Sequence, residues 1–254
     1  MAVRVVVAGA TGKTGSEATR AVWRAPELEL VGAVARSRLG QDVGVLLGEG
    51  PWKIPLEGDL EAVLRRTHPD VLVDFTLAEA AAEHALTALR HGVRPVVGAT
   101  GLPSPLVEEI RRRAAELELG AALIPNFSFG ILLLQRFCRE ALRFYPRVEV
   151  VELHHDQKRD RPSGTAQRLR RHLEDWGACS PVPVHSIRLP GLVAHHEVIF
   201  GGEGEVLTLR HDSLSRASFG PGVVLAVQGV LSRHELVEDL EALLPPRYGE
   251  PAQV

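Results

Sequence analysis

The sequence predicts an α/β protein, in which a domain built on a parallel sheet precedes a smaller α+β domain. Two observations predict the first domain: short apolar runs alternate with helical segments up to about residue 125, and a glycine-rich turn follows the first run. After that point, strand-like runs with hairpin-like spacing replace the alternation, which predicts the second domain. We expect a dinucleotide-binding domain at 1–125, a second domain at 126–216, and C-terminal helices at 217–254 that return to the first domain.

The first strand is predicted at residues 3–8, and a helix is predicted from Gly15 to about Arg24. Between them, "GKT" resembles the end of a P-loop, but a P-loop needs a glycine where Val7 stands, so that interpretation fails. The remaining array, G-x-x-G-x-x-G, is a variant of the dinucleotide fingerprint. A strand before it and a helix after it indicate a Rossmann-like pyrophosphate site. The alternative is a glycine-rich turn that binds nothing.

Further strands are predicted at 28–35, 70–76, 94–101 and 121–125, with helices at about 78–91 and 104–117 and a looser stretch with Gly and Pro after the second strand. Ligands of parallel sheets bind where the strands end at their carboxyl side. The turns at those ends are therefore the candidate cofactor site, which comprises Gly9, Ala10, Thr11, Gly12, Lys13, Thr14, Arg36, Ser37, Phe75, Thr76, Gly98, Ala99, Thr100, Pro125, Asn126 and Phe127.

The turn after the second strand indicates which nicotinamide cofactor is preferred. NAD-preferring folds place an acidic residue there, but this chain offers Arg36, Ser37 and Arg38, and no Asp or Glu before Asp42. Arginines suit the extra phosphate of NADPH, and Lys13 adds a cation nearby. We expect NADPH to be preferred, or both NADPH and NADH to be used with NADPH bound more tightly. The alternative is that the arginines are merely solvated.

The second domain is predicted to contain a helix at about 130–145, a strand at 147–155 and a helix at 164–176, followed by strands at 184–190, 193–202 and 205–212. The stretch 222–244 is helical by periodicity, and we expect it to pack on the first domain.

Composition narrows the function classes. The chain has 254 residues, 45% of them hydrophobic and 24% charged, with a net charge of −3, which favours neither nucleic acid nor an anionic membrane as a partner. The apolar run in 129–145 is too short to span a bilayer. Cys138 and Cys179 lie far apart in no metal-ligand spacing, so we expect no metal site and a cytoplasmic protein.

The densest polar cluster is "ELHHDQKRDRPSGTA", residues 152–166. His154 and His155 end a strand and point to opposite faces, which disfavours a paired metal clamp. Lys158 adds a compact cation. Pro162 and Ser163 open a helix whose first N–H groups suit an anion. Together these groups indicate a negatively charged small molecule and proton transfer. The alternative is a solvated loop beside an ordinary helix cap.

This cluster resembles the signature of the dihydrodipicolinate reductases, E-x-H-H-x-x-K-x-D-A-P-S-G-T-A, and only Arg161 departs from it. The resemblance extends to "VAGATGKTG", "VDFT", "VGATG", with Ala99 where the family has a threonine, and "PNFSFG".

The resemblance implies a reductase of the diaminopimelate route to lysine that uses NADH or NADPH, acts on a cyclic dicarboxylate and forms a homotetramer. It also implies that the domain at 126–216 serves substrate binding and oligomerisation. It implies that His154 is the proton donor and Lys158 its acidic partner, and that the substrate carboxylates are held by His155, Ser163, Gly164 and Thr165. Arg216 resembles a further basic position.

The family's run before residue 195 is interrupted here by Pro190 and Ala194, and we expect His195 and His196 at the strand surface or an interface.

Two rival functions remain open. One is another two-domain dehydrogenase, such as one acting on aspartate semialdehyde, which needs a nucleophilic cysteine. The other is a redox sensor that binds NADPH without turnover. The reductase interpretation requires the His154–Lys158 loop and the capped helix to face the nicotinamide ring across an interdomain cleft.

Overall fold

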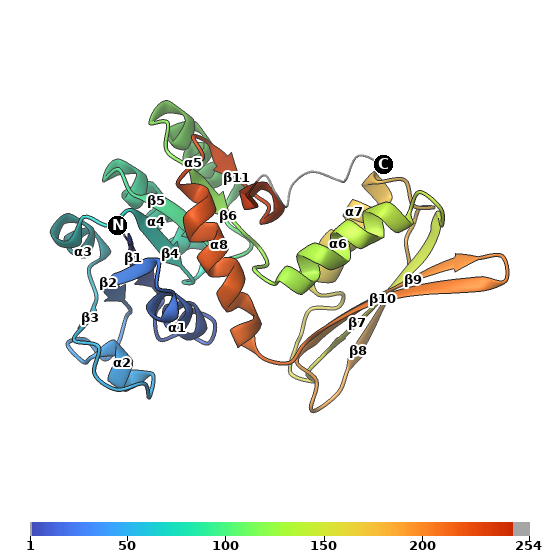
Figure 1. The fold of residues 1–254 in the computed structure, drawn as a ribbon, viewed down its shortest axis with the longest axis horizontal. Coiled ribbons are helices and arrows are strands. Elements are labelled where there is room, and N and C mark those ends of the chain that lie inside the picture. Colours follow the sequence, from blue (N-terminus) through green and yellow to red (C-terminus); the bar gives the residue numbers. More distant parts are fainter. Residues whose placement is uncertain (1, 246–254) are drawn as a thin grey trace. The chain divides into compact units, whose positions relative to one another are not determined.

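The computed structural model describes residues 2–245, which form two units (Figure 1). Unit 1 holds the described residues up to Phe127 and those from Phe219 onward. Unit 2 is Ser128–Ser218.

Unit 1 is built on a seven-stranded sheet in which every pairing is parallel. Its strand order is β11-β6-β5-β4-β1-β2-β3. The core strands are short, β-branched and buried, as expected for a sheet covered on both faces. Their bounds are β1 Val3–Ala8, β2 Leu28–Val34, β3 Leu56–Glu57, β4 Val71–Asp74, β5 Arg94–Val97, β6 Ala121–Leu123 and β11 Leu236–Val237. The predicted α/β fold with a parallel sheet is confirmed.

Two groups of helices pack against this sheet. In one group, α1 (Gly15–Arg24) contacts α8 (Gly220–Val230). In the other, α4 (Ala78–Arg90) lies between α3 (Leu60–Thr67) and α5 (Ser104–Glu116). The short α2 (Val43–Leu46) follows β2.

The strand order reverses between β1 and β4, and Ala8 is the register partner of Asp74 there. The turn after β1 and the turn after β4 therefore begin side by side. Ligands of open α/β sheets bind at such a switch point.

Unit 1 differs from the prediction in two places. The looser stretch after β2 contains α3, where the Asp59 carboxylate caps the helix by accepting a hydrogen bond from the Ala62 amide. The predicted helix over 222–244 is wrong beyond Val230, because residues 236 and 237 instead pair with β6 and extend the sheet. The edge strand β6 offers unpaired backbone N–H and C=O groups to a further strand. The hydrophobic pattern of residues 222–244 does not indicate this pairing with a distant segment.

Unit 2 has a four-stranded sheet in the order β10-β9-β7-β8. Two helices, α6 (Phe129–Ala141) and α7 (Gly164–Asp175), cover one face of it and bury an apolar core. Its strands are β7 Arg147–His154, β8 Val184–Arg188, β9 Ala194–Gly202 and β10 Glu205–Ser213. The described chain also has two 3₁₀ turns: Arg216–Phe219, where unit 2 ends, and Glu241–Leu243 in unit 1.

His195 and His196 were expected at the strand surface or an interface, and the first of these alternatives is wrong. Both residues lie on β9, an inner strand of the sheet, and are buried, with exposed fractions of 8% and 3%. His196 faces the covered side, where Val198 and Phe200 are also buried. His195 is held by Asp212, whose Oδ1 lies 2.6 Å from its Nδ1.

Among residues 2–245, no helix combines the length and apolar character that a bilayer span requires.

Candidate functional site

The glycine turn after β1 is wound so tightly that it requires glycine at two positions. Gly9 has φ of +75°, which L side chains rarely adopt. A Cβ on Gly15 would lie 2.0 Å from the Gly9 carbonyl oxygen. The amides of Gly9 and Ala10 donate to the Val34 carbonyl at 2.9 and 3.2 Å, which ties the turn to the end of β2. These are the roles that a dinucleotide-binding turn assigns to its glycines, so the residues fit a pyrophosphate.

A pocket of about 390 Å³ opens beside this turn in unit 1. It brings together the turns that follow β1, β4 and β5, which were predicted to lie at one edge of the sheet. Its lining comprises Lys13, Thr14, Phe75, Thr76, Leu77, Ala78, Gly98, Ala99 and Thr100. Leu77 and Ala78 are the two lining residues that sequence reasoning did not select.

Close packing shapes this pocket. A Cβ on Gly98 would lie 2.2 Å from the Phe75 ring, so the glycine leaves room for that ring. The Phe75 ring also lies beside the Phe127 ring, with centroids 5.3 Å apart. The predicted residues Pro125 and Asn126 lead into Phe127, which is buried in unit 1.

A buried carboxylate fixes the loop after β4. Asp74 is fully buried, and its Oδ1 accepts hydrogen bonds from the Thr76 amide at 2.7 Å and the Thr76 hydroxyl at 2.6 Å. Its Oδ2 lies 2.6 Å from Nδ1 of His84, on α4. His84 was not predicted from the sequence. It lies near the start of α4, and because side chains of a helix tilt toward its N-terminus, the His84 ring is directed toward the end of β4.

The predicted cofactor residues Arg36 and Ser37 lie just beyond β2 and are exposed. Val34, two residues earlier, accepts the hydrogen bonds of the glycine turn, so Arg36 follows the segment that contacts this turn.

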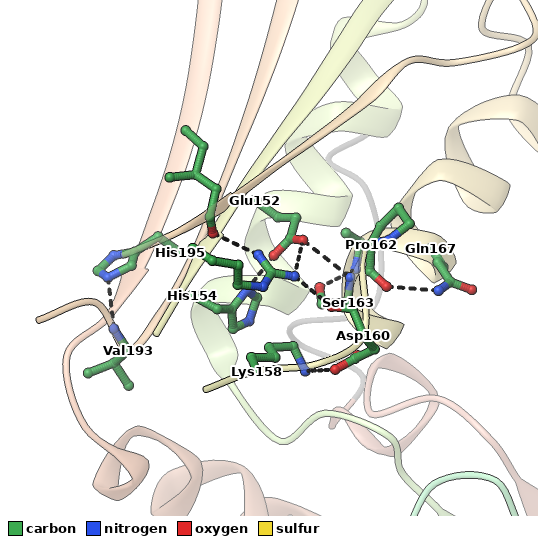
Figure 2. Close-up of polar contacts among 12 residues, drawn as sticks. Glu152, His154, Lys158, Asp160, Pro162, Ser163, Gln167, Val193 and His195 are labelled. Atoms are coloured by element: carbon green, nitrogen blue, oxygen red, sulfur yellow. Dashed lines mark hydrogen bonds and ion pairs between the residues drawn. The ribbon is translucent and has the colours of Figure 1, made fainter. Parts of the chain in front are cut away.

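In unit 2, the end of β7 carries a buried group of charged side chains (Figure 2). The Glu152 carboxylate is fully buried; its Oε2 is hydrogen bonded to Nδ1 of His154, and its Oε1 accepts from Nη2 of Arg188 at 2.6 Å. The Arg188 side chain is 1% exposed. Glu152 and His154 share a face because they are two residues apart on a strand.

Burial and neighbouring cations set the charge states of this pair. Burial lowers the pKa of His154 below its ordinary value; the bond to Glu152 opposes this shift, while Lys158 and Arg188 add to it. Burial raises the pKa of Glu152, but bonds from Arg188, Ser186 and His154 outweigh it and hold that pKa below the usual range. Near neutral pH the pair is therefore a carboxylate beside a neutral imidazole.

Lys158 lies in the loop between β7 and α7, near the Glu152–His154 pair (Figure 2). Its Nζ lies 2.8 Å from Oδ1 of Asp160, and Figure 2 shows this pair next to Ser163. Although burial alone would raise the pKa of Asp160, bonds from Lys158 and from its own and Gly164 backbone amides hold it below the ordinary value. In this structure, the Asp160 carboxylate thus contacts Lys158 and the start of α7, which were predicted to bind a negatively charged small molecule.

The start of α7 is built as predicted. Ser163 is the N-cap, and its hydroxyl accepts a hydrogen bond from the Ala166 amide at 3.2 Å. Gly164 is exposed, whereas Thr165 and His155 are half-buried. The backbone amide of Ser163 also donates a hydrogen bond to Oε1 of Glu152, at 3.3 Å.

Three residues of this site were missed by sequence reasoning: Glu152, Asp160 and Arg188. Strand alternation was the signal for Glu152, since it shares the face of His154. Arg188 has no such local signal, because only the β7–β8 register, in which it opposes His154, brings it to the site. Arg216, the further basic position, lies in a 3₁₀ turn and is exposed.

His196 borders the same site from β9. Its ring meets the His154 ring edge to face, with centroids 5.5 Å apart. Burial lowers the pKa of His196 to about 3, and neither ring nitrogen has a hydrogen-bond partner among the described residues. His196 is therefore a neutral ring that confines His154.

Other features of the described chain are poorer candidates for a catalytic site. A second pocket, of about 440 Å³, is lined by Arg147, Val148 and Cys179 among others, but it lies at the opposite end of β7 from His154. Burial raises the pKa of Cys138 to about 12, which disfavours it as a nucleophile. Within residues 2–245, no group of three or more His, Cys, Asp or Glu side chains is arranged to hold a metal ion.

Comparisons with known proteins agree over most of the chain. Two family models match, described as dihydrodipicolinate reductase, N-terminus, over residues 3–127 and dihydrodipicolinate reductase, C-terminus, over residues 130–244. A 4-hydroxy-tetrahydrodipicolinate reductase of Syntrophomonas wolfei is 45% identical, covering 95% of this chain and 98% of the relative. The corresponding protein of Moorella thermoacetica is 42% identical at the same coverage.

A solved structure is similar as well. It is a dipicolinate-bound dihydrodipicolinate reductase from Paenisporosarcina sp. TG-14, with a TM-score of 0.84 and 35% identity, covering 96% of this chain and 100% of that one.

Proposed function

This chain belongs to the dihydrodipicolinate reductase family, and we infer that it reduces 4-hydroxy-tetrahydrodipicolinate, or the dehydrated form derived from it, to tetrahydrodipicolinate. The reaction is a step of the diaminopimelate route to lysine and makes the protein an oxidoreductase. The observation that carries the residue assignment is the buried Glu152–His154 pair beside Lys158 and the capped end of α7.

Unit 1 binds the nicotinamide cofactor through the turns at the carboxyl edge of its sheet. The glycine turn takes the pyrophosphate with its backbone amides and the N-terminus of α1. The pocket formed by Lys13, Phe75, Thr76 and the loop at 98–100 takes a further part of the cofactor. When bound, the cofactor supplies a hydride.

Unit 2 binds the dicarboxylate and supplies the proton. The amides of Gly164 and Thr165 with the Ser163 cap, helped by His155, hold the substrate carboxylates at the positive end of α7. Lys158 is drawn from Asp160 to the incoming carboxylate, since both anions suit the same ammonium group.

His154 is the proton donor. Reduction of one ring carbon moves electrons toward the ring nitrogen and leaves an enamine that must be protonated at a neighbouring carbon. A substrate dianion beside His154 raises the tendency of this imidazole to carry a proton, which opposes the effect of burial. General acid catalysis by such a group contributes about 10²- to 10⁴-fold in rate.

NADPH is the preferred cofactor. Arg36 and Ser37 follow β2, where the adenosine ribose of a dinucleotide lies in this type of fold, and Arg38 and Lys13 add positive charge. A guanidinium favours the extra phosphate of NADPH. Loss of one such charge-assisted bond costs about 1.5–3 kcal/mol, so Arg36→Ala should weaken NADPH by about 10-fold or more and leave NADH nearly unchanged.

The protein acts as a cytoplasmic homotetramer. Exposed apolar side chains of unit 2 support association, among them Ile187, Leu189 and Val206, which are 37%, 54% and 67% exposed. Light scattering should give four times the mass of one chain.

The deciding assay follows NADPH absorbance after addition of freshly prepared substrate, with NADH in a parallel series. We expect turnover with both cofactors and a higher kcat/KM with NADPH. A protein that binds NADPH but never oxidises it would instead be the redox sensor. A higher kcat/KM with NADH would contradict the role given to Arg36.

A further inference from the structure

Glu152 opens the polar motif of unit 2, but proton donation by His154 does not by itself need this carboxylate. A charged group taken fully out of water is costly unless it is paired. Glu152 is nevertheless 0% exposed, at the centre of the sheet end that carries His154.

Its two oxygens have different partners. Oε2 meets Nδ1 of His154, whereas Oε1 accepts from the Arg188 guanidinium at 2.6 Å and from the Ser163 amide at 3.3 Å. One carboxylate thus joins the proposed proton donor to the first residue of the proposed anion site (Figure 2).

The Arg188 contact identifies the charge form of Glu152. Its guanidinium is 1% exposed and stays protonated, so the carboxyl group it contacts is ionised. An ionised carboxylate accepts hydrogen bonds and cannot donate one. Nδ1 of His154 must therefore be the donor in this pair.

We propose that Glu152 is a positioning residue that keeps the hydrogen of neutral His154 on Nδ1, so that the proton for the substrate is taken up and delivered at Nε2. This role deepens the proposed reductase function and rests on it. During the transfer, Nε2 loses its proton to the ring carbon, and Nδ1 keeps its own hydrogen on the bond to Glu152. Because an imidazole free in water prefers its hydrogen on Nε2, the pair reverses the intrinsic preference.

The other neighbours of His154 leave this assignment to Glu152. Lys158 and Arg188 are cations that cannot accept a hydrogen bond from the ring. His196 touches the ring edge to face and confines its rotation without a hydrogen bond.

The direct test uses wild-type protein and reads the nitrogen chemical shifts of neutral His154 by NMR, with His154→Gln identifying its signals. We expect a protonated Nδ1 and a bare Nε2. A protonated Nε2 with a bare Nδ1 would overturn the proposal. The reading needs no turnover, so a wild type with the expected tautomer but no reductase activity would refute the proposed function alone.

Substitution provides the second test. In Glu152→Gln, the amide can donate to Nδ1, so the Nε2–H form should appear and the pKa of His154 should fall. We expect kcat to drop by about 10- to 100-fold, as for other groups that orient a functional histidine, with the KM for NADPH unchanged. Glu152→Asp keeps the charge and should recover part of the loss. Unchanged kcat and tautomer in Glu152→Gln would contradict the proposal.

The chain offers a matched control on the same strand. Glu149 also pairs with a histidine, and its Oε2 lies 2.8 Å from Nε2 of His185, but both side chains are more than half exposed. Glu149→Gln should leave kcat and the His154 signals unchanged. A loss of activity equal to that of Glu152→Gln would assign the effect to β7 as a whole and reject the specific role of Glu152.

Discussion

Each unit contains a fully buried carboxylate that holds a histidine near the end of a strand, and the two pairs differ in what else the carboxylate binds. In unit 1, Asp74 binds the amide and hydroxyl of Thr76, two residues further along, as well as His84. In unit 2, Glu152 binds Arg188 and the start of α7 as well as His154. The first pair fixes a loop, whereas the second places an imidazole among charged groups. The chemistry of a carboxylate–histidine pair is thus decided by its remaining partners.

Replacing the two histidines should give the largest contrast. His154→Gln removes the proposed proton donor, and kcat should fall by about 10²- to 10⁴-fold while NADPH binding persists. His84→Gln keeps a polar side chain beside Asp74 and should change kcat by much less. Steady-state kinetics with cofactor titration by fluorescence separates the two effects. Equal losses in both variants would remove the distinction between the pairs.

Replacing the unit 1 carboxylate should weaken cofactor binding. Asp74→Asn retains the size of the side chain but loses the charged acceptor of three hydrogen bonds, so the loop carrying Phe75 and Thr76 loosens. We expect a loss of about 1–3 kcal/mol in stability and a higher KM for NADPH, with kcat less affected. Denaturant unfolding and kinetics provide the check. A fall in kcat with an unchanged KM would assign Asp74 a catalytic role.

The elements around the glycine turn of unit 1 could be predicted from the sequence. The strand at 3–8 and the helix from Gly15 to Arg24 match the structure, because β-branched runs and a glycine turn are local signals. The turns that line the unit 1 pocket were selected for the same reason, since parallel strands end at one edge.

What was missed depends on pairing between distant segments. Arg188 reaches the site only through the register of β8 with β7, and Val237 joins the sheet only because β6 has an open edge. His196 was expected at the strand surface or an interface, yet it alternates inward with Val198 and Phe200 and is buried. The local sequence carries no information about the strand pairings that place Arg188 and Val237, whereas the burial of His196 follows an alternation that can be read locally.

Acid should destabilise unit 2 through its buried histidines. Burial lowers the pKa of His154, His196 and His211, with His196 at about 3. Below a pH of about 6.5, and for His196 down to about 3, the unfolded chain binds protons that the folded state does not, so stability falls as the pH falls. For His196 the slope is at most about 1.4 kcal/mol per pH unit.

Tryptophan fluorescence can assign this loss to unit 2. Trp176 packs on the unit 2 core, whereas Trp23 and Trp52 stack in unit 1, so a variant with Trp23→Phe and Trp52→Phe reports on unit 2. Adding His196→Phe should flatten the pH dependence. An unchanged slope would mean that His196 does not titrate as its burial requires.

In the proposed function, unit 1 binds a hydride donor and unit 2 protonates the ring that receives the hydride. The reduction of freshly prepared 4-hydroxy-tetrahydrodipicolinate by the wild type, with NADPH that carries deuterium at the transferable position, tests this directly. We expect one deuterium in the tetrahydrodipicolinate ring for each NADPH oxidised. NADPH oxidation without deuterium in the ring, or no oxidation when this substrate is added, would contradict it.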